Sequence, residues 1–169
     1  MVTIRCTAKL LSRTGLHAEP VALTPTAALG DWHANILFFH RAQVLLIVSD
    51  ASLLAVVTPA REVRALASHL TQGLSVLLEH LGAPLTWIER EVREMAEARF
   101  APTRSRSVLA TMHNHKVQIE GRFYEWGGVY PLEMSLDLSQ CPAGPLQYRL
   151  PVEVALDLLR HRHDRASLV

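Results

Sequence analysis

The stretch from residue 34 to residue 58, ANILFFHRAQVLLIVSDASLLAVVT, decides the fold. It contains three apolar, partly β-branched runs at residues 34–40, 44–49 and 53–58, and each pair of runs is separated by three residues. Connections this short fit hairpins and cannot hold a crossover helix, so the runs predict an antiparallel β-meander. Because the runs are almost continuously hydrophobic, we expect helices to cover at least one face of the sheet.

The first residues of the chain predict one more strand. Residues 2–6 alternate between apolar and polar side chains, which is typical of a strand with one buried face. This register puts Arg5 on the face opposite Ile4. One or two helical turns are expected at residues 8–14, followed by an irregular loop at residues 17–29.

The longest helical pattern follows the meander. We expect a helix to begin at Thr58-Pro59, since threonine is a good N-cap and proline fits the first helical position. Apolar residues then recur at spacings of three and four up to Leu81. The segment at residues 86–89, TWIE, matches a capping box, and its helix is expected to carry an apolar stripe as far as Phe100.

Further helices are predicted in the second half of the chain. Ser105 or Ser107 is expected to cap a third helix that runs to the glycine pair at 127–128. The weakly patterned residues 129–138 are interpreted as a further strand or an extended edge, and Pro151 is expected to open a last helix. Together the patterns predict one α+β domain over residues 1–169: a small antiparallel meander of three long strands, extended by the N-terminal strand and covered by three to four helices.

The composition indicates a soluble cytoplasmic protein. Seventeen Lys and Arg residues against sixteen Asp and Glu residues leave a net charge of +1, which gives no bulk attraction for nucleic acid or an anionic membrane. The two cysteines have no Cys-x-x-Cys spacing and predict reduced thiols. Arg5 and Lys9 interrupt the N-terminus where an export signal needs an apolar stretch, and no run approaches the roughly 20 apolar residues of a membrane helix. We therefore expect no membrane association, while a homo-oligomer stays open.

Motifs for metal binding and catalysis are missing. His113 with His115 and His161 with His163 form His-x-His pairs, but both pairs fall in predicted helices, where side chains two residues apart point about 200° apart. We therefore expect no metal and no cofactor. The sequence also lacks a Gly-x-Ser-x-Gly elbow and a phosphate-cradling glycine loop, which argues against an enzyme.

A first candidate site lies just before the long strands, at Asp31, Trp32, His33 and Asn35. In one interpretation this run is a turn that caps a hydrophobic strand with a packed Trp32. In the other it forms a shallow pocket, where Trp32 stacks on a ligand and His33 or Asn35 supplies hydrogen bonds.

A second candidate site comprises Arg104, Ser105, Arg106 and Ser107, at the predicted start of the third helix. Unpaired backbone N–H groups and the helix dipole favour an anion at such a position. The alternative is a solvated loop in which the two arginines pair with nearby glutamates.

Four runs resemble a known family in the same order. They are IRCTAKLL at residues 4–11, LGDWHAN at 29–35, RSVL at 106–109 and GPLQYRLP at 144–151. Together they resemble an uncharacterised bacterial domain of unknown function, which occurs as small stand-alone proteins, some encoded on plasmids. The chain departs from that pattern at residue 110, where the family favours glycine, and at residues 112–114, where it favours Met-Asn-Asp. The resemblance implies a single domain and supplies no catalytic residue.

Two functions are compatible with these observations. The leading hypothesis is a non-catalytic binding or regulatory module with a protein or nucleic-acid partner. The alternative is a small hydrolase or nuclease, with its site between the Trp32 turn and the helix that starts near Ser107.

Overall fold

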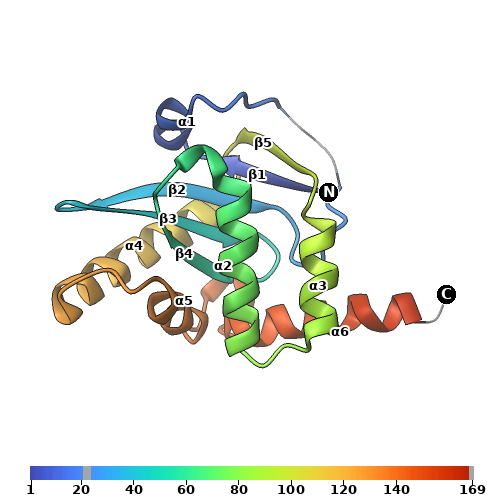
Figure 1. Cartoon of the computed structure of the whole chain (residues 1–169). Helices are drawn as coiled ribbons and strands as arrows, with labels where there is room; N and C mark the ends of the chain where they lie inside the picture. Colours follow the sequence, from blue (N-terminus) through green and yellow to red (C-terminus); the bar gives the residue numbers. More distant parts are fainter. Residues whose placement is uncertain (21–23, 168–169) are drawn as a thin grey trace.

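The computed structural model describes residues 1–20 and 24–167. Its centre is a five-stranded sheet in the order β4-β3-β2-β1-β5 (Figure 1). The strands are β1 (Val2–Cys6), β2 (Trp32–Phe39), β3 (Ala42–Ser49), β4 (Ala55–Pro59) and β5 (Ala98–Pro102).

The expected meander is confirmed, since β3 lies antiparallel between β2 and β4. The prediction that a helix begins at Thr58-Pro59 is wrong, because both residues still belong to β4, where Pro59 pairs with Val44. β4 is an edge strand, so the missing N–H of Pro59 leaves no ladder bond unmade.

The sheet is mixed and not purely antiparallel. β1 is parallel to both of its neighbours, β2 and β5. A parallel neighbour needs a long connection, and the segment from residue 7 to residue 31 supplies it between β1 and β2. The expected helical stripe as far as Phe100 is also wrong. Phe100 lies in β5 and pairs with Ile4, and the preceding helix ends at Glu94.

Six α-helices occur in the described part of the chain, more than the three to four expected. They are α1 (Ala8–Thr14), α2 (Leu66–His80), α3 (Leu85–Glu94), α4 (Arg106–Trp126), α5 (Pro131–Ser139) and α6 (Pro151–Ser167), with short 3-10 turns at Val63–Ala65 and Gly144–Leu146. The segment interpreted as a further strand forms α5, which packs against β4. Pro131 stands at its start, where a proline lacks no hydrogen bond.

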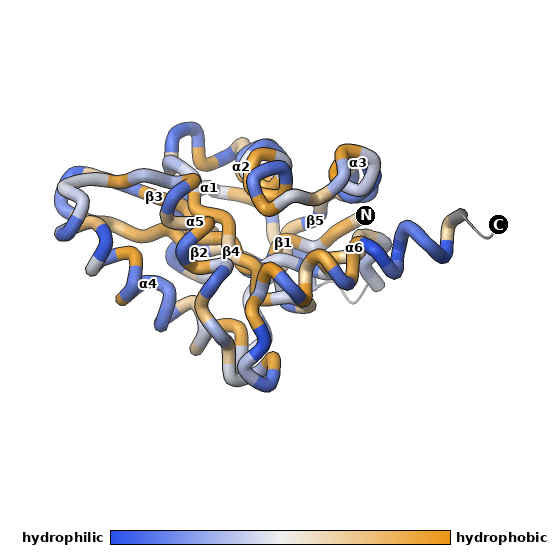
Figure 2. Tube along the Cα trace, turned by 90° about the horizontal axis from the view of Figure 1, so that it is seen from below, coloured by the Kyte–Doolittle hydropathy of each residue, from blue (hydrophilic) through white to orange (hydrophobic). Residues whose placement is uncertain are grey.

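The helices cover the two faces of the sheet separately. One face packs on α1, α2, α3 and α6 through a cluster that includes Ile4, Trp32 and Leu70. The other face packs on α4 and α5 through a cluster that includes Leu46 and Met112. Figure 2 shows the hydrophobic strands between α2 and α3 on one side and α4 on the other. Along β1 and β2 this second face changes from apolar to polar, and there the candidate site lies.

A buried glutamate holds the segment that leads into β2. Glu91 on α3 is 2% exposed, and its two carboxylate oxygens accept the backbone N–H groups of Ala28 (2.8 Å) and Leu29 (2.9 Å). Burial raises the pKa of Glu91 above its ordinary value, although both N–H groups oppose this. The carboxylate therefore fixes the path of the chain immediately before the residues of the candidate site.

Candidate functional site

The candidate site lies where β1 and β5 end side by side. These strands are parallel, and their last residues, Cys6 and Pro102, are register partners. The chain leaves β1 into α1 on one face of the sheet and leaves β5 towards α4 on the other face. A place where two neighbouring parallel strands lead the chain to opposite faces of the sheet is called a topological switch point. Ligands of open α/β sheets bind there, outside the carboxyl ends of the strands.

Local hydrogen bonds position the start of α4 at this edge. The N–H of Thr103 donates to the carbonyl of Cys6 (3.2 Å), which ties the chain before α4 to the end of β1. Ser105 is the N-cap, and its hydroxyl accepts the N–H of Val108 (3.3 Å). Of the two serines that the sequence left open as caps, the structure selects Ser105. The N–H groups of Arg106 and Ser107 have no acceptor among the described residues.

The two arginines at this helix start are exposed and form no ion pair within residues 1–20 and 24–167. The first turn of α4 contains no acidic residue. The alternative interpretation, in which Arg104 and Arg106 pair with nearby glutamates, therefore finds no support in the described part of the structure. Their charges add to the positive end of the α4 dipole.

Beneath this helix start lies a buried ion pair. Arg5 Nη2 donates to Asp31 Oδ2 at 3.0 Å, and both side chains are almost fully buried. The second oxygen of Asp31 accepts the N–H of Thr3 at 2.9 Å. Arg5 lies on the opposite face of β1 from Ile4, as the alternation along β1 predicts. Both oxygens of Asp31 are thus engaged inside the protein, which indicates that this carboxylate organises the site.

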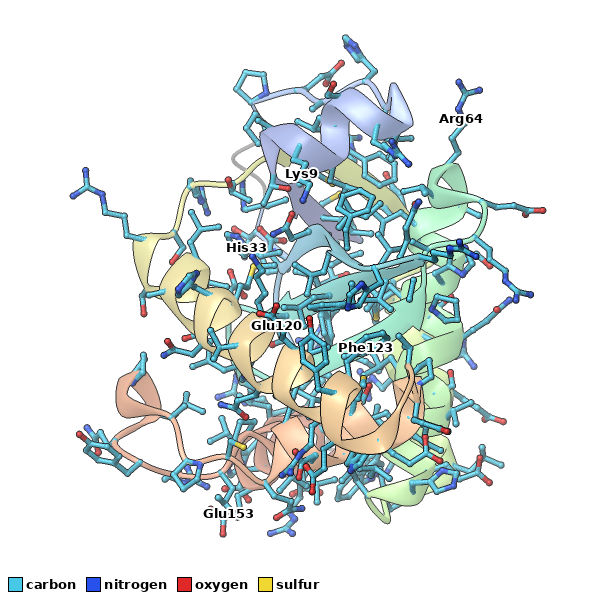
Figure 3. All side chains as sticks on the ribbon, turned by 90° about the vertical axis from the view of Figure 1, so that its left-hand side faces the viewer. Lys9, His33, Arg64, Glu120, Phe123 and Glu153 are labelled. Carbon is cyan, nitrogen blue, oxygen red and sulfur yellow. The ribbon has the colours of Figure 1, made fainter. Side chains whose placement is uncertain are left out.

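His33 is the buried neighbour of this pair. It is 1% exposed, it is the register partner of Arg5, and its Nδ1 has no hydrogen-bonding partner among the described residues. The pKa of His33 is lowered to about 4, chiefly by burial; the charges of Arg5 and Arg104 contribute to the lowering, and the charge of Asp31 opposes it. The imidazole is therefore neutral near pH 7. Figure 3 shows His33 beside α4, below α1.

Asp50 completes the polar cluster from the turn after β3. Its N–H donates to the carbonyl of Asp31 (2.9 Å). Partial burial raises the pKa of Asp50, the charge of Asp31 adds to this, and Arg5 and Arg104 oppose it. Because the charge of Arg104 acts on both Asp50 and His33, the two candidate sites of the sequence lie close together in the structure.

Trp32 and Asn35 have different surroundings. Trp32 is fully buried in the cluster on the other face of the sheet, so it has no surface with which to stack on a ligand. Asn35 is half-buried, and its Oδ1 accepts the hydroxyl of Thr7 (2.8 Å), the N-cap residue of α1. The sequence interpretation did not include Arg5 or Asp50 in the site. The only signal for Arg5 was its place on the polar face of β1, and Asp50 looked like an ordinary turn residue.

Neither His-x-His pair forms a metal centre among the described residues. His113 and His115 both lie in α4, as the sequence predicts; His113 is exposed, whereas His115 is 4% exposed. His161 and His163 both lie in α6. No group of three or more His, Cys, Asp or Glu side chains in residues 1–20 and 24–167 is arranged to hold a metal ion. Within the same residues, no helix is long and apolar enough to cross a bilayer.

These features define an α+β domain whose mixed sheet ends in a polar edge between two helix starts. The chain belongs to the family described as Domain of unknown function (DUF6933), whose model matches residues 3–154. A search of curated proteins found no match. Three of the four runs that resemble an uncharacterised family converge at the candidate site, because they contain Arg5, His33 and the start of α4.

Proposed function

We propose that this protein is a non-catalytic binding module of the bacterial cytoplasm, and that it binds the phosphate groups of a nucleic acid at the start of α4. The observation that carries the proposal is the position of Arg104 and Arg106. Both side chains are exposed without an ion pair in the described structure, and they flank the free N–H groups of a helix that starts at a topological switch point.

His33 gives independent support. A buried imidazole with an unpartnered nitrogen loses hydrogen bonds that it made to water, which costs free energy unless a ligand or water restores them. The charge of Arg104 reaches this imidazole, so an anion bound by Arg104 would also act on His33. The polar edge therefore offers directional donors and positive charge in one place.

The charge distribution along the chain favours the same surface. The protein is nearly neutral as a whole, but residues 98–119 contain four Arg or Lys residues and no Asp or Glu. This segment comprises β5, the turn at the candidate site and the first two thirds of α4. A polyanion would thus meet no acidic side chain from this segment on its approach to the start of α4.

A binding titration tests the proposal. Wild type, Arg104→Ala/Arg106→Ala and the control Arg93→Ala, which removes an exposed arginine of α3, are titrated with single- and double-stranded DNA and RNA. The titrations are run at about 50 and 200 mM salt. Two arginines release about two counterions, so the logarithm of the binding constant should fall with the logarithm of salt with a slope of about −2.

The double variant should lose most of the binding, and the control should keep it. Equal binding by the double variant would place the nucleic-acid site elsewhere. If wild type binds none of the four nucleic acids even at low salt, the nucleic-acid proposal fails and a protein partner becomes the better hypothesis.

The convergence of Asp50, His33 and Arg104 favours a second candidate, a small hydrolase or nuclease. A carboxyl group with a raised pKa can act as a general acid, and Arg104 could stabilise charge on a phosphoryl group. Hydrolysis of bis-p-nitrophenyl phosphate that is lost in Asp50→Asn would support this candidate. Absence of turnover with this substrate and with the four nucleic acids would exclude phosphodiester hydrolysis.

A further inference from the structure

Two adjoining cavities lie along β4, at the edge of the sheet opposite β5 and the start of α4. The first has a volume of about 440 Å³ and lies between the β2–β3 turn, the end of β4 and the segment before α5. The second has a volume of about 260 Å³ and lies between β4, α2 and α5. Pro59 and Pro131 line both cavities, so the two adjoin at these residues. In Figure 1, β4 lies between α2 and α5.

The first cavity is positively charged. Arg41 enters it from the β2–β3 turn and Arg61 from the segment after β4. Both side chains are exposed, and neither forms an ion pair within the described residues. The carbonyl of Arg61 accepts a hydrogen bond from His69 Nε2 on α2, which holds the backbone of Arg61 at the junction of the two cavities. None of the described residues that line this cavity is acidic.

The second cavity presents an apolar surface. The polar side chains in its lining each form a hydrogen bond inside the protein. Thr58 and His69 donate to backbone carbonyls, and Gln72 donates to the hydroxyl of Ser68. Ser135 accepts the N–H of Val57 and donates to a carbonyl at the start of its own helix. The surface that is left comes from apolar side chains, namely Val57, Pro59, Val76, Pro131 and Leu132. Val76 is 44% exposed, so its side chain is accessible at this surface.

A glycine sets the depth of this apolar cavity. A Cβ atom at position 73 would lie 2.7 Å from Val56 Cγ1 and 3.1 Å from Thr58 Cγ2, so α2 approaches β4 more closely than any larger residue permits. The cavity is thereby closed at its floor and open along the surface, with the charged cavity at one end.

We propose that the two cavities together bind a medium-chain carboxylate, with its head group between Arg41 and Arg61 and its aliphatic chain over Gly73 and Leu132. Guanidinium groups match a carboxylate with paired N–H donors, and the cavity beside them has mainly apolar walls. The combined space falls in the range of roughly 300–1,000 Å³ that is common for small-molecule sites. This site is separate from the polar edge at the start of α4.

Titration of ¹⁵N-labelled full-length protein with sodium octanoate tests the proposal. We expect saturable shifts of the amide signals of Ala42, Ala60 and Leu132, which line the two cavities. Octanol has the chain without the charge, and acetate has the charge without the chain. Each should bind about tenfold more weakly than octanoate or worse, because each loses one half of the interaction.

Variants locate the two halves of the site. Arg41→Gln/Arg61→Gln should weaken octanoate binding about tenfold or more, and Val76→Ser should weaken it severalfold. These side chains are exposed, so both variants should keep the thermal melting point of wild type, and the control Arg93→Gln should bind normally. Three results would overturn the proposal: no saturable shifts up to about 10 mM octanoate, equal binding of octanol, or unchanged affinity in the double arginine variant.

Discussion

Acidification should destabilise this protein between pH 6.5 and 4, because two buried histidines are neutral in the folded state. Burial lowers the pKa of both His33 and His115 from 6.5 to about 4, and their side chains are 1% and 4% exposed. In this pH range the unfolded chain binds protons at these positions and the folded chain does not. Stability therefore rises with pH across the range and is lost as pH falls.

The magnitude follows from the size of the shift. A change of one pKa unit corresponds to about 1.4 kcal/mol, so each histidine should contribute about 3 kcal/mol of pH dependence between the two pKa values. Asp50 and Glu91 act in the opposite direction, since burial raises their pKa values and the folded state binds protons there more readily. Together the two histidines should remove about 6 kcal/mol, which is comparable to the lower bound of the roughly 5–15 kcal/mol that is typical of a folded domain.

The assay is urea unfolding of wild type, His115→Leu and His113→Leu at a series of pH values from 7 to 4. His113 and His115 are both in α4, but only His115 is buried, so the pair is a matched control. The pH dependence should shrink by about 3 kcal/mol in His115→Leu and stay the same in His113→Leu. A wild-type stability that is flat over this range, or an unchanged slope in His115→Leu, would refute the reasoning.

Three other substitutions test the fold around the site, each by the free energy of unfolding. Glu91→Ala leaves the buried N–H of Leu29 and the partly buried N–H of Ala28 without acceptors and should cost roughly 2–5 kcal/mol; a loss below about 1 kcal/mol would mean that water replaces the carboxylate. Asp31→Asn removes the carboxylate charge that pairs with the buried guanidinium of Arg5 and should cost roughly 3–5 kcal/mol, whereas Arg5→Met/Asp31→Leu should cost less than the single change; a larger loss in the double variant contradicts this. Leu70→Ala, at a fully buried position of α2, should cost roughly 2–5 kcal/mol, and a near-neutral result would mean that α2 does not pack on the sheet.

The meander and the start of α4 could be predicted because their signals are local. Apolar runs separated by three residues can form only hairpins, and β2, β3 and β4 follow that prediction. Ser105 and Gly127 mark the two ends of α4. Both could be predicted because a hydroxyl N-cap and a left-handed C-cap act on the adjacent backbone. The capping box expected at residues 86–89 is wrong, because α3 begins at Leu85 after Pro84 and has no side-chain cap. The local pattern gave the wrong prediction at Phe100, which lies in β5. Its spacing fits the apolar stripe of the preceding helix as well as a strand, so periodicity alone does not decide between them.

The sequence by itself thus determined the α+β class, the three antiparallel strands and the basic start of α4. Only the tertiary structure decided that β1 runs parallel between β2 and β5, since alternation along a strand fixes which side chains share a face but not the direction of the neighbouring strand. That pairing places Arg5 beside His33, and the turn after β3 adds Asp50. These residues are far apart in the chain and carry no common motif, because the contacts that unite them form only when the strands pair.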